Sequence, residues 1–464
     1  MMSFRSIWFL VYFLLSLSGS AQVVVKSLTY DNYIAIVRDH HPVMIQANET
    51  VHLAEGNLLE ARGVFDPVIK GGMEQKEYDD KKYFQLIDAG LVVPTWVGVD
   101  LKLGYTQSIG DYISAMDKMP TNGLVYAGVS IPIGQGLFYD KRRTNLDKAK
   151  TYLSMAGDER KLMINEIIYQ ASADYWNWFE TYHQKMAIED LLKKSRERLD
   201  NILTSAKIGD VPYVDTLEAA IQYQNYQSLL MEYETAEKNA RSYVNVHLWA
   251  DGLVPLELGD ETNPEDISAT EIDLDIFEMA NDTLIWSHPK LNIQQSKLVI
   301  SDIELRMAKE SLKPKLNLNY NLLNEPVGGD LVGFNPSDYK FGLDLEIPIF
   351  LRNARGQLQA KKAEMLINET ELKLNKEELK AKFISTVNNS KNELDQAKLL
   401  SEIVMNYRNL VQAERKLFES GESSLMMLNY REIALLQAEV KWIEKVSKSN
   451  MAALKIVYAL GQLN

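Results

Sequence analysis

The residue types best suited to catalysis or metal binding are few and scattered in this sequence. Cysteine is absent, which removes disulfides, thiolate zinc sites, iron–sulfur clusters and cysteine nucleophiles. The six histidines are His40, His41, His52, His183, His247 and His288. Their spacing matches no HExxH or similar ligand motif, there is no Walker loop, and Gly134-Gln135-Gly136 lacks the rest of a dinucleotide fingerprint. We therefore expect no catalytic residue, no metal site and no cofactor, and we predict that the protein is not an enzyme.

Carboxylates are the abundant titratable groups in this chain of 464 residues. Asp and Glu number 64 against 50 Lys and Arg, so the formal net charge is -14, which argues against nucleic acid as a partner. Residues 251–285 hold eleven acids and no Lys or Arg. Their spacing matches no calcium-loop template, so we interpret the segment as a solvated acidic linker, with a metal site as the alternative.

The N-terminus has the residue order of a secretory signal. Arg5 precedes an apolar run over residues 7–17, and small residues follow up to Ala21. The run is about half of the ~20 residues that a spanning helix needs, which disfavours the alternative of a membrane anchor. We predict a signal peptide over residues 1–21, cleaved after Ala21, and an exported mature chain.

The remaining sequence is a tandem duplication. Five residues of the first half recur at an offset of 247: His41, Pro42, Leu58, Ala61 and Pro67 recur as His288, Pro289, Leu305, Ala308 and Pro314. Ile131-Pro132-Ile133 recurs as Ile347-Pro348-Ile349, and Arg143, Leu146, Lys150 and Gly209 recur at an offset of 212 as Arg355, Leu358, Lys362 and Gly421. The smaller second offset means that the first half carries an insert before its Ile-Pro-Ile motif.

Each half contains a long segment with apolar residues at steps of three and four, which predicts a helix with one buried stripe. The first stripe is Ile164, Ile168, Ala171, Tyr175, Trp178, Tyr182 and Met186. The second is Leu379, Phe383, Val387, Leu394, Ala397, Val404 and Val411. No proline interrupts residues 140–206, so this helix should be roughly 100 Å long at 1.5 Å per residue.

Other segments alternate apolar and polar residues with a period of two, as strands with two different faces do. Examples run from Val97 to Tyr105, from Leu316 to Leu322 and from Tyr339 to Ile347. Such strands suit either a soluble sandwich or a membrane barrel that is oily outside and wet inside. The signal peptide, the tyrosine-rich strand ends and the long helices on both sides favour the barrel.

The duplicated order of these features resembles the TolC-like outer-membrane efflux proteins. The features are an amphipathic helix over residues 28–62 with an internal His-Pro, Phe65-Asp66-Pro67 before the strands, Ile-Pro-Ile before each long helix, and the C-terminal Leu460-Gly461-Gln462-Leu463. The resemblance covers nearly all of the mature chain. It implies a homotrimer in which each protomer gives four strands to a twelve-stranded barrel, continued by an α-helical tunnel across the periplasm.

We therefore expect a mainly α, α+β fold: a tandem-repeat channel with four or more β-strands per protomer in a shared trimeric barrel, and a long coiled-coil periplasmic tunnel. The predicted first repeat is 22–250, with strands in 64–134, a long helix over 140–206 and a helix over 212–250. The acidic linker is 251–285. The second repeat is 286–464, with strands in 314–350 and helices over 352–419 and 424–460. We leave open where the extra first-repeat strands, within 82–109, belong: above the barrel or within it.

Two turns are candidate partner sites. Gly209 and Gly421 lie where one apolar stripe stops and the next begins, and glycine can adopt the positive φ that ends a helix. The resemblance implies that these turns form the periplasmic tip, where a coiled-coil adaptor docks. The candidate docking residues are Ile208, Gly209, Asp210, Val211, Ser420, Gly421, Glu422 and Ser423. A purely structural need for glycine is the alternative explanation.

The tunnel gate is predicted from a departure from the family pattern. Family members commonly carry two aspartates six and nine residues after the second tip glycine, where this chain has Met427 and Tyr430. The equivalent first-repeat positions are Asp215 and Glu218. Three symmetry-related carboxylates near an axis repel one another and attract cations, so Asp215 or Glu218 could form an acidic ring. Met427 and Tyr430 would form an apolar or hydrogen-bonded ring, and these four residues are our gate candidates. The alternative is that the acids merely face solvent.

The resemblance implies the outer-membrane channel of a tripartite efflux or type I secretion system, which conducts substrates passively from the periplasm. The expected partners are two further copies of the chain, a periplasmic adaptor, an inner-membrane pump and outer-membrane lipid. The expected location is the bacterial outer membrane, with the helices extending into the periplasm. A periplasmic coiled-coil adaptor or scaffold without a barrel is the alternative function.

Overall fold

The computed structural model describes residues 22–23, 27–267, 287–327 and 333–463. The predicted signal peptide, residues 1–21, and residues 268–285 of the predicted linker lie outside the described residues. The chain divides into two compact units. The helical unit comprises Met1–Asn48, Arg160–Pro289 and Lys376–Asn464, and the sheet unit comprises Glu49–Glu159 and Lys290–Asn375.

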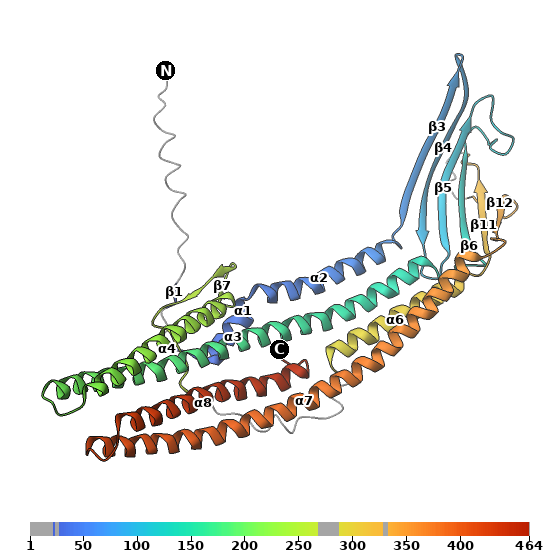
Figure 1. Cartoon of the computed structure of the whole chain (residues 1–464). Coiled ribbons are helices and arrows are strands. Elements are labelled where there is room, and N and C mark those ends of the chain that lie inside the picture. The colour runs from blue at the N-terminus through green and yellow to red at the C-terminus, as the bar shows by residue number, and fades with distance from the viewer. Residues whose placement is uncertain (1–21, 24–26, 268–286, 328–332, 464) are drawn as a thin grey trace, which may run out of the picture. The chain divides into compact units, whose positions relative to one another are not determined.

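Six antiparallel strands form one sheet in the sheet unit (Figure 1). They are β3 (Val68–Tyr78), β4 (Lys81–Pro94), β5 (Asp100–Ile109), β6 (Leu124–Pro132), β11 (Lys315–Asn324) and β12 (Tyr339–Glu346). Their order across the sheet is β12-β11-β6-β5-β4-β3. The first repeat thus gives four strands and the second gives two, so the sheet has six strands and not the four that the family resemblance implies.

The extra strands of the first repeat lie within this sheet, as β4 and β5, next to β3 and β6. The alternation from Val97 onward predicts a strand before residue 100, but the structure has a turn there. Thr95 donates its hydroxyl to the Val99 carbonyl at 2.7 Å, and Gly98 has a φ of +86°. Because positive φ suits glycine and breaks an extended strand, β5 begins only at Asp100.

The register of the strands shows which side chains share a face of the sheet. Residues directly opposite in an antiparallel ladder point to the same side. One row of such partners runs from β3 to β12 through Ile69, Leu91, Leu103, Ala127, Leu322 and Tyr339. A row on the other side contains Lys102, Gly128, Asn321 and Lys340. All six strands therefore contribute to one apolar face. The opposite face is polar on β5, β11 and β12, and it is mixed on β4, where Val92 and Leu86 lie on that side.

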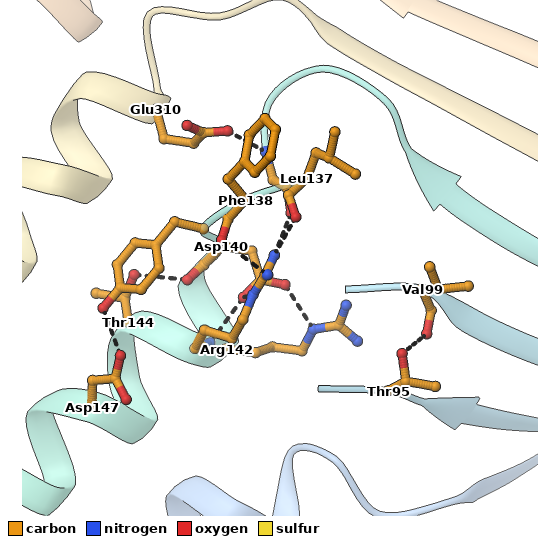
Figure 2. Close-up of polar contacts among 12 residues, drawn as sticks. Thr95, Val99, Leu137, Phe138, Asp140, Arg142, Thr144, Asp147 and Glu310 are labelled. Atoms are coloured by element: carbon orange, nitrogen blue, oxygen red, sulfur yellow. Dashed lines mark hydrogen bonds and ion pairs between the residues drawn. The ribbon is translucent and has the colours of Figure 1, made fainter. Parts of the chain in front are cut away.

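The sheet passes into helix α3 (Lys141–Lys207) through a tightly hydrogen-bonded turn, shown in Figure 2. Asp140 accepts a hydrogen bond from the Arg143 backbone at 2.8 Å, the usual way to satisfy a free N–H at a helix start. The Arg143 guanidinium donates to the carbonyls of Gly136 at 2.5 Å and Leu137 at 3.1 Å. Glu310 accepts from the Gly136 N–H at 3.3 Å. These bonds fix the direction in which α3 leaves the sheet.

Four helices contribute to the sheet unit: α2 (Pro42–Gly63), α3, α6 (Pro289–Glu310) and α7 (Arg352–Glu419). Leu58 of α2 packs with Leu146 of α3. Glu304 of α6 binds Lys148 of α3 and also Lys361 of α7, the latter at 2.5 Å. These contacts place the helices side by side in the order α2, α3, α6, α7, as Figure 1 also shows.

The predicted helix over 28–62 is two helices in the structure. Helix α1 (Tyr30–His40) ends before His41, whose ψ is extended at 134°, and α2 begins at Pro42. The residue before a proline is kept out of the α region by a clash with the ring, which explains the break. Pro289 begins α6 in the second repeat.

The helical unit contains the large core. Helices α3 and α7 hairpin back into α4 (Tyr213–Val246) and α8 (Leu425–Ala459), as Figure 1 shows. The stripe of α3 is confirmed at Ile168, Ala171, Tyr175 and Trp178, which are all fully buried, whereas Met186 is 43% exposed. The stripe of α7 is confirmed along its length: six of its seven residues are buried, namely Leu379, Phe383, Leu394, Ala397, Val404 and Val411.

The described part of the predicted linker forms short strands that pair with other segments of the chain, so it is more than a solvated connector. Its short strands are β8 (Val254–Pro255), β9 (Glu257–Leu258) and β10 (Asn263–Pro264). They pair with β7 (Trp249–Ala250), β1 (Gln22–Val23) and β2 (Ser27–Leu28), respectively. Glu265 accepts a hydrogen bond from the Tyr30 backbone at 3.2 Å. This segment thus pairs with residues 22–23 and 27–28.

No helix in the described ranges combines the length and the apolar character that crossing a membrane requires.

Candidate functional site

The two hairpin tips have the same backbone geometry. Gly209 has a φ of +80° and Gly421 a φ of +77°, so the prediction that glycine ends both helices with positive φ is confirmed. Gly209 donates to the Ala206 carbonyl at 3.1 Å, and Asp210 donates to the Ser205 carbonyl at 3.0 Å. These two bonds satisfy the last carbonyls of α3 in the pattern known as a Schellman motif.

The second tip repeats this motif at the end of α7. Gly421 donates to the Phe418 carbonyl at 3.0 Å and Glu422 to the Leu417 carbonyl at 2.8 Å. A Cβ at either tip glycine would meet no atom within 4 Å. Glycine is therefore required by the backbone conformation and not by lack of space.

The predicted docking residues are not equally accessible. Ile208 is 78% exposed, an unusual state for isoleucine. Asp210, Ser420 and Glu422 are also exposed. Val211 is half-buried against a small core of Leu199, Ile202, Ala219 and Leu425. Ser423 is half-buried as well and donates its hydroxyl to Glu414. The exposed part of each tip is thus its outer turn.

An apolar groove runs between α4 and α8, directly behind the tips. Its walls are Val214, Leu217 and Ile221 from α4, and Met426, Tyr430 and Ile433 from α8. Val214 and Tyr430 are 63% and 64% exposed, and Met426 is 67% exposed. Exposed apolar side chains gathered in this way mark an interaction surface.

The four gate candidates divide between two places. Glu218 and Tyr430 both line the groove, and Glu218 accepts a hydrogen bond from Asn429 at 3.3 Å. Asp215 is half-buried and Met427 is exposed, and neither lines the groove. The structure therefore places Glu218 and Tyr430 in the groove, whereas Asp215 and Met427, three residues away on the same helices, lie outside its walls.

A buried ion cluster near the tips was not predicted from the sequence. Glu432 of α8 is 1% exposed and lies 2.7 Å from a guanidinium nitrogen of Arg198 in α3. Arg415 of α7 donates to the same carboxylate at 3.2 Å. One carboxylate thus joins three helices. The available signal was that Glu432 occupies an apolar stripe on α8, between Leu428 and Leu436.

A second hollow lies between α4 and α8; it shares Gln222 and Ile433 with the groove and is also lined by Tyr226. Tyr226 is 3% exposed, and burial together with the Glu432 carboxylate raises the pKa of its phenol to about 12. This tyrosine stays protonated at physiological pH and contributes packing and a neutral hydroxyl. Across the residues that the structure describes, no three His, Asp or Glu side chains are arranged to hold a metal ion.

Residues 294–462, from α6 to the end of α8, match the family model described as outer membrane efflux protein. The match covers most of the second repeat, which is therefore similar to the outer membrane efflux proteins. The match confirms the resemblance to the TolC-like proteins. No curated protein sequence matches this chain.

Solved structures extend the similarity in fold to both repeats. The CmeC outer membrane channel of Campylobacter jejuni has a TM-score of 0.68 at 11% identity, covering 93% of this chain and 85% of the other. The open-state MtrE outer membrane channel of Neisseria gonorrhoeae has a TM-score of 0.69 at 11% identity, with coverages of 94% and 89%. VceC, an outer membrane protein of Vibrio cholerae, has a TM-score of 0.66 at 12% identity, with coverages of 93% and 96%. The fold class predicted from the sequence is confirmed.

Proposed function

We propose that this protein is the outer-membrane channel of a tripartite efflux or type I secretion system. The observation that carries the proposal is the two-faced sheet, whose strands lead directly into the 67-residue helix α3 and the 68-residue helix α7. A sheet with one oily and one polar face fits a lipid-embedded wall around a wet lumen. Helices of roughly 100 Å suit a conduit that reaches into the periplasm.

Conduction is passive in this proposal. The channel supplies a continuous wet path, and an inner-membrane pump supplies the energy. The second repeat matches the model of outer membrane efflux proteins, and the fold is similar to that of solved outer membrane channels. The polar face of the sheet carries Lys102, Asn319 and Asp344, which are joined by hydrogen bonds of 3.2 and 3.1 Å. Such a surface is compatible with water and with polar cargo. The adaptor or scaffold alternative gives no reason for an apolar face on all six strands.

The working assembly is a homotrimer bound to a periplasmic adaptor and an inner-membrane pump. Docking at the tips is supported by the exposed outer turns around Gly209 and Gly421, and by the apolar groove between α4 and α8. An adaptor with apolar side chains at the end of its coiled coil would cover this surface. The gate is proposed among Asp215, Glu218, Met427 and Tyr430, close to the same tips.

The experiment is fractionation of cells that express the full chain, followed by electrophoresis of the purified protein. We expect the protein in the outer-membrane fraction, migrating as a trimer before heating and as a monomer afterwards. In planar bilayers the trimer should open discrete conducting pores. A soluble periplasmic monomer without pore activity would contradict the proposal.

A further inference from the structure

The two edges of the six-stranded sheet are long and open. β3 pairs only with β4, and β12 pairs only with β11, among the described residues. All eleven residues of β3 are exposed, as are seven of the eight residues of β12. An open strand edge presents unpaired N–H and C=O groups, which cannot be left unsatisfied in lipid.

We propose that β3 of one protomer pairs with β12 of the next copy of this chain, so that three protomers close a barrel of eighteen strands. This inference rests on the proposed trimeric channel. It differs from the twelve strands that the family resemblance implies, because all four strands of the first repeat become part of the membrane wall.

The directions of the edge strands are complementary. β3 begins next to the end of α2, and β12 ends next to the start of α7, so they run in opposite directions relative to the helices. Rotation about a three-fold axis would therefore set them antiparallel, like every other pair in the sheet. An eighteen-stranded ring also has the even number of antiparallel strands that single-chain bacterial barrels have.

Side chains of β4 and β5 continue the packing of the neighbouring strands on both faces of the sheet. Its apolar side chains Leu91 and Leu103 continue the row that joins Ile69 to Tyr339. On the polar face, Tyr126 of β6 lies over Gly104 of β5 and Gly90 of β4. A Cβ would come within 2.5 Å of the Tyr126 hydroxyl at Gly104, and within 2.6 Å at Gly90. Two glycines on neighbouring strands thus make room for a ring from the third.

The width of a six-stranded wall is close to the width of the helix layer. Strands about 4.8 Å apart and tilted by about 40° each occupy roughly 6 Å of a barrel's circumference, so six span about 38 Å and four about 25 Å. The helices α2, α3, α6 and α7 of the sheet unit, at 8–10 Å apart, span about 32–40 Å. A protomer with six strands in the wall therefore matches its own helix layer.

Engineered disulfides test the seam, because the natural chain has no cysteine. The face pattern requires the apolar positions of β3 to oppose those of β12. Leu343→Cys in β12 is combined in turn with a cysteine at each of three β3 positions on the apolar face, Ile69, Gly71 and Met73. Matched controls place the second cysteine on the polar face, at Lys70, Gly72 or Glu74. Bridged strands need a Cα separation of about 4.4–6.8 Å, which only same-face neighbours offer.

After oxidation and heating without reductant, we expect covalent dimers and trimers from at least one apolar-face pair and from none of the polar-face pairs. A second series pairs Leu343→Cys with a cysteine at Leu101, Leu103 or Tyr105 of β5. Crosslinking in that series alone would mean that β3 and β4 stand outside the wall, and would overturn the proposal. A trimer on unheated gels that crosslinks in neither series would overturn it as well. Absence of any trimer would instead refute the proposed channel assembly.

Discussion

Replacement of Glu432 by alanine should loosen both hairpin tips. The carboxylate is 1% exposed, and its partner Arg198 is 11% exposed, so removing the acid leaves a buried guanidinium without its counter-ion. Breaking a buried pair in this way costs about 3–5 kcal/mol. Arg415 is 41% exposed and can turn to solvent, so we assign it only the ~1 kcal/mol or less that is typical of surface pairs.

The assay is native-state hydrogen exchange of the purified trimer, read by mass spectrometry on peptides from α3, α7 and α8 near the tips. A loss of about 4 kcal/mol in local stability raises the opening equilibrium about 10³-fold, since 1.4 kcal/mol is a factor of ten. Peptides around Arg198 and Glu432 should exchange faster by that order. Peptides of the sheet should keep the wild-type rate.

Two further variants test whether the unpaired buried charge is the cause of the faster exchange in Glu432→Ala. Asp200→Ala removes an exposed ion pair with Arg196 on α3, in which both side chains are more than half exposed, and should leave protection close to that of the wild type. The double variant Arg198→Met with Glu432→Met replaces the buried pair by apolar side chains and should recover most of the protection. If Glu432→Ala exchanges within about threefold of wild type, the burial argument for this cluster is wrong.

Three further predictions concern pH, the gate and docking. Burial, and then the nearby His247, lower the pKa of His41 to about 4, and its Nδ1 accepts a hydrogen bond from the Val43 backbone at 3.1 Å. Because the unfolded chain binds this proton more tightly, the stabilisation is full above about pH 6.5 and is lost as the pH falls towards 4. His41→Gln should therefore make the melting temperature depend less on pH between about 4 and 6.5. In planar bilayers, Asp215→Asn with Glu218→Gln should reduce cation preference or divalent-ion block, and Met427→Ala with Tyr430→Ala should raise the resting conductance; wild-type values in both would place the gate elsewhere. Ile208→Glu puts a charge on the exposed tip and should abolish crosslinking to the adaptor while the trimer remains intact, whereas unchanged crosslinking would remove this turn from the docking surface.

Local chemistry made much of the fold predictable from the sequence. Gly209 and Gly421 mark the hairpin turns because few other residues adopt positive φ without strain. The stripe through Ile168, Tyr175 and Trp178 specifies a helix because its spacing follows the 3.6-residue period. The alternation of apolar and polar residues in Leu316–Leu322 specifies a strand with one apolar and one polar face, because side chains in a strand alternate with a period of two. Each of these signals is contained within a few turns or a single strand.

Partnerships between distant segments were decided only by the tertiary structure. The alternation through Val97 and Val99 is broken by the turn at Gly98, and strand order depends on pairing across the sheet, which the pattern of one strand does not encode. Glu432 meets Arg198 and Arg415 only because three helices converge, and the groove between α4 and α8 exists only once both hairpins have folded. The sequence alone determined the periods, the helix ends and the two faces, since these follow from neighbouring residues. Packing of distant segments decided the six-stranded order, the buried charges and the shape of the tip surface.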